Sequence, residues 1–123
     1  MTRQNLDEWV TKLGEAWVNL DTQAALILVD KMDIRWYESP FEDALTDWDD
    51  IHKVWLADLA QQKDVEFSHE VLLCDGTEGI ARWQAKFVRV SNGEVANLEG
   101  IFHIRLNDKN LCTYFMMWVV ERQ

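Results

Sequence analysis

Two runs of alternating apolar and polar residues, Ile80 to Val90 and Val95 to Leu106, constrain the fold of this chain more than any other feature. Residues 91–94 join them and include Asn92 and Gly93. An Asn-Gly pair between two alternating runs favours a hairpin, because both residues tolerate the positive φ of a type I′ turn. We therefore expect a long antiparallel hairpin with one buried face.

The length and charge of the chain limit its organisation and its partners. The 123 residues suffice for one hydrophobic core, so we expect a single domain over residues 1–123. A formal net charge of −10 without a basic cluster repels phosphate, which argues against nucleic acid and membranes as partners. The sequence has no apolar run of the ~18 residues that a membrane span needs and no secretory signal at residues 1–8, which predicts a cytoplasmic protein.

The two cysteines, Cys74 and Cys112, both lie in predicted strands. Neither belongs to a CxxC pair or lies at metal-ligand spacing from a histidine. We therefore expect two reduced, buried thiols rather than a disulfide or a zinc site, and we expect no metal and no cofactor.

Helical spacing of apolar residues predicts three helices ahead of the long strands. Asp21 can cap the second helix and Asp47 the third, because each carboxylate can accept a backbone N–H of the first turn. Between these helices, Met32 to Tyr37 reads as a short strand that Pro40 ends. The first helix carries the apolar stripe Leu6, Trp9, Val10, Leu13 and Trp17, and the third carries Ile51, Val54, Trp55 and Leu59.

Four long strands follow the helices. From Val65 the apolar period changes to two, and the strand that begins there leads through Asp75-Gly76 into the hairpin. The last strand, Leu111 to Val120, is apolar on both faces and must be covered on both faces. Three helices, one short strand and four antiparallel strands indicate an α+β fold.

Several segments, in this order, resemble the SnoaL-like branch of the nuclear transport factor 2 superfamily across nearly the whole chain. They are Ala16-Trp17, Trp36 to Phe41, Asp47 to Trp55, Asp64 to Ser68, Ala81 to Ala85, Leu98 to Phe102 and Tyr114 to Trp118. The resemblance implies three helices packed in a strongly curved mixed sheet, a cystatin-like α+β cone. In this family the cone encloses an active site, a ligand pocket or almost no space.

With the apolar faces turned inward, the cone of this chain is lined mainly by aromatic rings. A small, largely apolar molecule would contact them. The expected ligand-binding residues are Trp17, Trp36, Tyr37, Phe41, Trp55, Trp83, Phe87, Phe102, Tyr114, Met116 and Trp118. The same rings can also simply fill the cone, and the sequence leaves both possibilities open.

Catalytic members of the family carry polar residues at positions where this chain does not. The resemblance to ketosteroid isomerase would place its catalytic tyrosine at about Leu13, its general base at about Ser39 and its oxyanion-hole acid at about Phe102. Leucine and phenylalanine can neither donate a hydrogen bond nor hold a proton. Limonene epoxide hydrolase uses an Asp-Arg-Asp arrangement. Arg82 can match its arginine, but Gln84 and Met116 fall near its acids and cannot act as bases.

Three polar residues remain candidates for a site. His69 could be a general base on the inward face, since imidazole titrates near neutral pH, or a core histidine with an internal partner. Glu38 could be a carboxylate at the mouth of the cavity or a solvated loop acid. Tyr114 could donate to a ligand carbonyl or to an internal acceptor. We therefore weigh a small-molecule binding protein against an isomerase, dehydratase or hydrolase that uses His69, Glu38 and Tyr114, and against a dimerisation module with a filled pocket.

The last strand also predicts a homodimer. If Tyr114, Met116 and Trp118 point inward, the alternate residues form an outer apolar face that no helix is left to cover. That face would hold Ile101, Phe115, Met117 and Val119. An exposed apolar patch of this kind, rimmed by polar residues, is typical of an interface, and a twofold axis would bring it onto itself.

Overall fold

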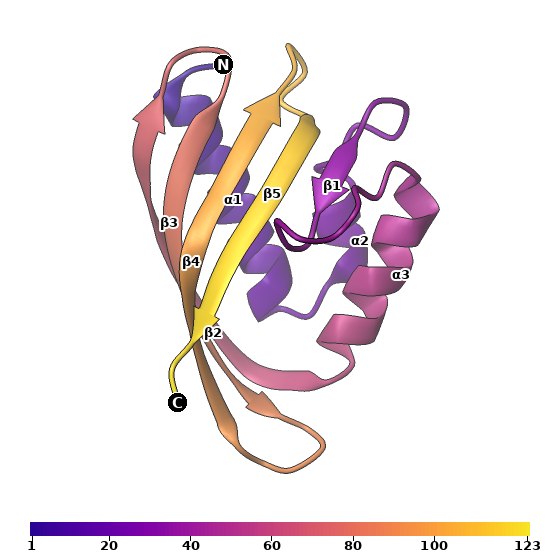
Figure 1. Ribbon diagram of the computed structural model, residues 1–123, viewed down its shortest axis with the longest axis vertical. Helices are drawn as coiled ribbons and strands as arrows, with labels where there is room; N and C mark the ends of the chain where they lie inside the picture. Colours follow the sequence, from indigo (N-terminus) through magenta and orange to yellow (C-terminus); the bar gives the residue numbers. More distant parts are fainter.

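The computed structural model covers residues 1–123 and contains three helices and a five-stranded sheet (Figure 1). The α+β class predicted from the sequence is confirmed. In chain order the elements are α1 (Arg3–Val18), α2 (Thr22–Leu26), β1 (Arg35–Tyr37), α3 (Trp48–Leu59), β2 (Gln62–Cys74), β3 (Gly79–Arg89), β4 (Val95–Leu106) and β5 (Cys112–Glu121).

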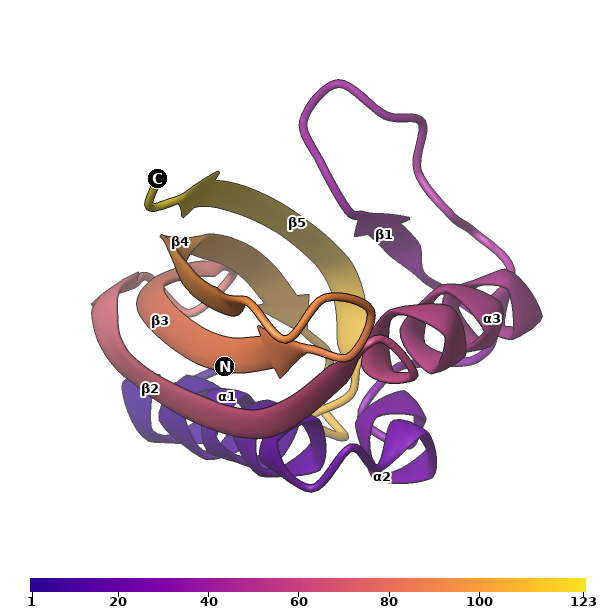
Figure 2. The same cartoon turned by 90° about the horizontal axis from the view of Figure 1, so that it is seen from below.

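The sheet is strongly curved and does not close on itself (Figure 2). Its strand order is β1-β5-β4-β3-β2, and every pairing is antiparallel except that of β1 with β5. Helix α1 lies behind the sheet, whereas α2 and α3 lie beside its β1 end (Figures 1 and 2). No helix covers the front face in Figure 1, which we call the outer face.

The predicted hairpin is present as β3 and β4, with Trp83 opposite Gly100. The predicted type I′ turn is wrong, because only Gly93 has a positive φ, of 73°, whereas Asn92 does not. The Gly93 N–H donates to the carbonyl of Arg89, and the Arg89 N–H donates to the carbonyl of Glu94, both at 2.8 Å. The loop is therefore longer than a two-residue turn, and a single glycine supplies the left-handed residue that closes it.

Both predicted helix caps are present. The Asp21 carboxylate accepts the N–H of Ala24 at 3.1 Å, and that of Asp47 accepts the N–H of Asp49 at 2.8 Å. Helix α2 is short and ends at Leu26. Together α1, α2, α3 and the sheet enclose one core of 26 buried apolar residues.

The last strand, β5, faces the opposite way from the prediction. Phe115 is 2% exposed and stacks on Trp36, whereas Trp118 is 41% exposed on the outer face. By strand alternation, Met117 and Val119 share the inward side of Phe115. The predicted dimer face of Ile101, Phe115, Met117 and Val119 is therefore wrong, except for Ile101, which lies opposite Trp118 on the outer face. Because both faces of β5 are apolar, alternation alone could not choose between them.

Both cysteines are free thiols, and Cys112 is fully buried. Burial raises the pKa of its thiol above the ordinary value, which keeps it protonated. None of the helices has the length and the apolar character needed to cross a membrane.

Candidate functional site

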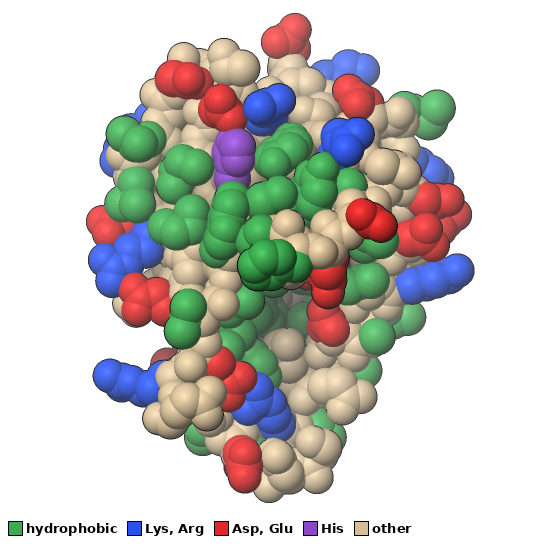
Figure 3. All heavy atoms as spheres, in the orientation of Figure 1, with side chains coloured by type: hydrophobic (Ala, Val, Ile, Leu, Met, Phe, Trp, Pro, Cys, Tyr) green, Lys and Arg blue, Asp and Glu red, His purple; other side chains and the backbone are tan.

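A pocket opens where α1, the end of β1 and α3 meet the inner sides of β4 and β5. Figure 3 shows a hollow with apolar walls and acidic side chains at its edge. The free space in the pocket is about 70 Å³. Its lining residues are Leu13, Trp17, Trp36, Glu38, Trp55, Asp58, Leu59, Gln62, Phe102, Phe115 and Met117.

Aromatic rings form most of the pocket wall. The Trp36 indole stacks on Phe115 with ring centroids 3.9 Å apart, and it forms a T-shaped pair with Trp55 with centroids 6.3 Å apart. Deeper in the cone, Trp17 and Phe102 pack on Trp83 at 5.6 and 5.0 Å. These deeper rings fill most of the cone, so the free space is confined to the side near α3.

Glu38 is the most perturbed ionisable group of the pocket. It directly follows β1, and its Oε1 accepts a hydrogen bond from Trp36 Nε1 at 3.1 Å. Burial raises the pKa of Glu38 to about 7, helped by the nearby carboxylates of Asp58 and Glu42 and opposed by the Trp36 hydrogen bond. Glu38 therefore exchanges its proton near neutral pH, inside an aromatic pocket.

Two further polar groups line the pocket: Asp58 comes from the last turn of α3, one turn after Trp55, and Gln62 is the first residue of β2. Burial also raises the pKa of Asp58. The Gln62 side-chain carbonyl accepts the indole N–H of Trp17 at 2.6 Å, which leaves its amide N–H groups free to meet a ligand.

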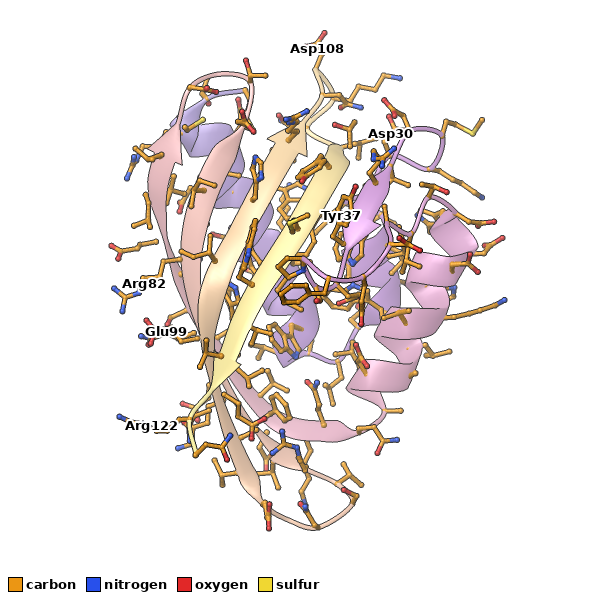
Figure 4. The ribbon with its side chains drawn as sticks, viewed as in Figure 1. Asp30, Tyr37, Arg82, Glu99, Asp108 and Arg122 are labelled. Carbon is orange, nitrogen blue, oxygen red and sulfur yellow. The ribbon has the colours of Figure 1, made fainter.

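Five of the site residues expected from the sequence line this pocket: Glu38, Trp17, Trp36, Trp55 and Phe102. The other expected residues lie elsewhere. Trp83 and Phe87 are buried in the core, and Phe41 is 100% exposed on the loop after β1. Tyr37, Tyr114, Met116 and Trp118 share the outer face of the sheet (Figure 4 labels Tyr37).

The structure does not bring His69 and Tyr114 to Glu38. The Nε2 atom of His69 lies 2.8 Å from Asp7 Oδ1 on α1, so that this histidine has an internal partner. The ring of Tyr114 contacts Tyr37 and His103 on the outer face. The three candidate polar residues therefore do not form one site.

Sequence reasoning missed Asp58, Gln62, Phe115 and Met117 as lining residues. For Asp58 a signal was present, because an acid at position i+3 from Trp55 interrupts the apolar stripe of α3. For Phe115 and Met117 no local signal existed, since β5 is apolar on both faces.

A second, larger hollow of about 810 Å³ lies on the outer face of the sheet. Its lining includes Arg82, Glu99 and Arg122, which Figure 4 labels. Arg82 Nε donates to the Glu99 carboxylate at 2.8 Å, and Glu70 lies 3.9 Å from the same guanidinium. Arg82 therefore already has carboxylate partners, and this open groove is a weaker candidate than the aromatic pocket.

Comparison with known proteins identifies the fold. Neither a model of a known protein family nor a curated protein matches this sequence. SalBIII, an epoxide hydrolase/cyclase-like enzyme with a role in pyran ring formation in the polyether salinomycin, superposes with a TM-score of 0.81 and 10% identity, over 95% of this chain and 92% of SalBIII. Delta 5-3-ketosteroid isomerase from Mycobacterium sp. superposes with a TM-score of 0.78 and 15% identity, over 96% of this chain and 98% of the isomerase.

A nuclear transport factor 2-like protein of unknown function from Exiguobacterium sp. gives a TM-score of 0.74 at 13% identity, over 94% of this chain and 98% of that protein. These identities are too low to carry an activity across, but the superpositions span almost the whole chain. The chain therefore has the cone fold of nuclear transport factor 2-like proteins, as the resemblance in its sequence predicts.

Proposed function

We propose that this chain, with its nuclear transport factor 2-like fold, binds a compact, largely apolar small molecule in the pocket between α1, α3 and β5. One observation carries the proposal: the pocket has aromatic walls and a partly buried carboxyl, Glu38, whose pKa is about 7. Apolar walls with a few polar groups that orient the ligand are typical of small-molecule sites.

The size of the pocket limits the ligand. Its free space of about 70 Å³ is well below the roughly 300 Å³ at which typical drug-sized sites begin. A single ring, or one compact group of a larger molecule that extends to solvent, suits such a space. We therefore expect a ligand of few non-hydrogen atoms inside the pocket.

Isothermal titration calorimetry with benzyl alcohol tests the proposal, with a pair of variants on adjacent residues of β5. Met117→Trp places a larger side chain in the pocket and should abolish binding. Met116→Trp makes the same change on the outer face and should retain it. Equal binding by both variants would count against a ligand in this pocket.

A second candidate function is proton transfer, as in an isomerase, and Glu38 is the observation that favours it. A carboxyl with a pKa near the working pH suits a general base. However, the indole N–H groups of Trp17 and Trp36 are already engaged inside the protein, so few donors remain to stabilise an oxyanion. Binding without catalysis is therefore the better supported of the two.

Exchange of the α protons of cyclohexanone for solvent deuterium, followed by NMR, tests the second candidate. Proton transfer through Glu38 predicts exchange above the buffer rate that Glu38→Gln lowers by about 10²-fold or more. Exchange at the buffer rate would rule out this activity on a compact ketone.

We also propose that two copies associate through the outer face. Its exposed and half-buried apolar side chains form what we call the outer patch, namely Leu73, Ile80, Ile101, Tyr114, Met116 and Trp118. Beside it, Arg105 lies 3.4 Å from Glu78, and Arg82 contacts Glu99. The net charge of −10 makes two copies repel each other. A rim that carries both charge signs offsets this repulsion, because the acids of one copy can pair with the basic residues of its twofold mate.

We propose the cytoplasm as the compartment of this protein, because free thiols stay reduced there.

A further inference from the structure

We infer that the ligand of the pocket is an organic cation, an amine whose ammonium group lies beside the Glu38 and Asp58 carboxylates and against the tryptophan rings. This inference rests on the proposed binding function and names the chemical class of the ligand.

The charges around the pocket are all of one sign. Its eleven lining residues include the acids Glu38 and Asp58 but no lysine, arginine or histidine. A third carboxylate, Glu42, is close enough to act on Glu38. The ion pairs of the protein lie elsewhere, on the sheet and between His69 and Asp7, so that none involves Glu38 or Asp58. A positive charge in the pocket would therefore meet carboxylates that no basic side chain of the protein neutralises.

The aromatic walls favour the same ligand. The N–H groups of Trp17 and Trp36 donate to Gln62 and Glu38, and Phe115 covers one face of Trp36, so a ligand meets the remaining carbon surface of these indoles. Of the side chains, the face of tryptophan attracts cations most strongly. Carboxylates and indole rings together form the kind of cage that recognises alkylammonium groups.

Other ligand classes fit the pocket less well. An anion would lie next to two carboxylates and would find few free donors. A neutral apolar molecule would remove water from the Glu38 carboxylate without replacing its hydrogen bonds, which costs free energy. An ammonium group restores those hydrogen bonds as charge-assisted ones.

Three probes of nearly equal size and different charge test the inference: benzylamine as its cation, benzyl alcohol, and benzoate. Each is titrated calorimetrically at pH 8, where Glu38 is mostly ionised. We expect the benzylammonium ion to bind at least about tenfold more tightly than benzyl alcohol, which corresponds to about 1.4 kcal/mol, and benzoate to bind most weakly.

Variants show whether the discrimination arises in the pocket. Glu38→Gln and Asp58→Asn should each lower benzylammonium affinity by about fivefold to tenfold and leave benzyl alcohol within about twofold. Asp108→Asn removes one negative charge from the turn between β4 and β5, far from the pocket (Figure 4), and serves as the matched control. It should leave the affinities for all three probes unchanged.

The outcomes separate this inference from the proposed function. If benzyl alcohol binds as tightly as benzylammonium, and Met117→Trp abolishes its binding, the pocket is a binding site but not a site for cations. If Asp108→Asn weakens benzylammonium as much as Glu38→Gln does, the effect comes from net charge and the inference fails. If none of the probes binds, the inference and the proposed function fail together.

Discussion

The indole of Trp36 lies flat on the ring of Phe115, with ring centroids 3.9 Å apart and planes 11° apart. The two residues are also partners in the parallel pairing of β1 with β5. This stack fixes which side of β5 faces the helices, and the indole nitrogen of the same Trp36 holds Glu38 in the pocket. One pairing of a short edge strand therefore sets both the wall of the pocket and its carboxyl.

The deep part of the cone should be essential for stability. Trp83 is 1% exposed and packs against Trp17, Phe67 and Phe102. Trp83→Ala leaves a large cavity there and should lower the free energy of unfolding by about 3–5 kcal/mol in urea denaturation. Trp83→Phe should lower the free energy of unfolding by clearly less than Trp83→Ala does. It keeps a ring in the core and removes an indole nitrogen that has no hydrogen-bond partner in the protein. Equal losses for both variants would contradict this packing.

Glu38 should make stability depend on pH. Burial raises its pKa from 4.5 to about 7, so that between these values the folded state binds the proton more tightly than the unfolded chain. Above pH 7 the buried carboxylate is charged and lowers the free energy of unfolding. As the pH falls from 7 toward 4.5, Glu38 is protonated in the folded state and this loss of stability disappears. We expect the gain in unfolding free energy from Glu38→Gln to be larger at pH 8 than at pH 5 by about 2–3 kcal/mol.

Urea denaturation of both proteins at the two pH values checks this prediction. Because the difference in unfolding free energy between wild type and variant is compared, the pH-dependent contributions of other titratable groups cancel. A constant difference across this pH range would show that Glu38 is solvated.

Much of this fold is predictable from the sequence because the signals are local. The alternation around residues 91–94 and the caps Asp21 and Asp47 each act within a few residues of chain. No local signal decides which side of β5 turns toward the core, because Phe115 and Trp118 are both large and apolar. Only the pairing of β5 with β1 distinguishes the two sides. The same pairing decides the burial of Glu38, so the sequence names this residue as a candidate but cannot distinguish a pocket acid from a loop acid.

Binding should be independent of the two polar candidates that lie outside the pocket. His69 contacts Asp7, and Tyr114 lies on the outer face. His69→Gln and Tyr114→Phe should therefore leave benzylammonium affinity within about twofold of wild type, measured by calorimetry, in contrast to Glu38→Gln. A tenfold loss in either variant would place the site elsewhere.

Self-association should depend on the outer patch. Met116→Glu puts a charge at its centre and should give a monomer in sedimentation velocity at micromolar concentration, where the wild-type protein sediments as a dimer. Phe41→Glu makes a comparable change at a fully exposed residue outside the sheet and should leave the dimer intact. A monomeric wild-type protein, or a dimer that survives Met116→Glu, would refute an interface on the outer patch.

The most direct test of the central claim, a small-molecule site in the aromatic pocket, is an NMR titration of the seven tryptophan indole N–H signals with benzylamine at pH 8. Trp17, Trp36 and Trp55 line the pocket, whereas Trp118 lies on the outer face. We predict saturable shifts for the three pocket indoles and none for Trp118. Shifts confined to Trp118, or no saturable shift at any indole, would contradict the claim.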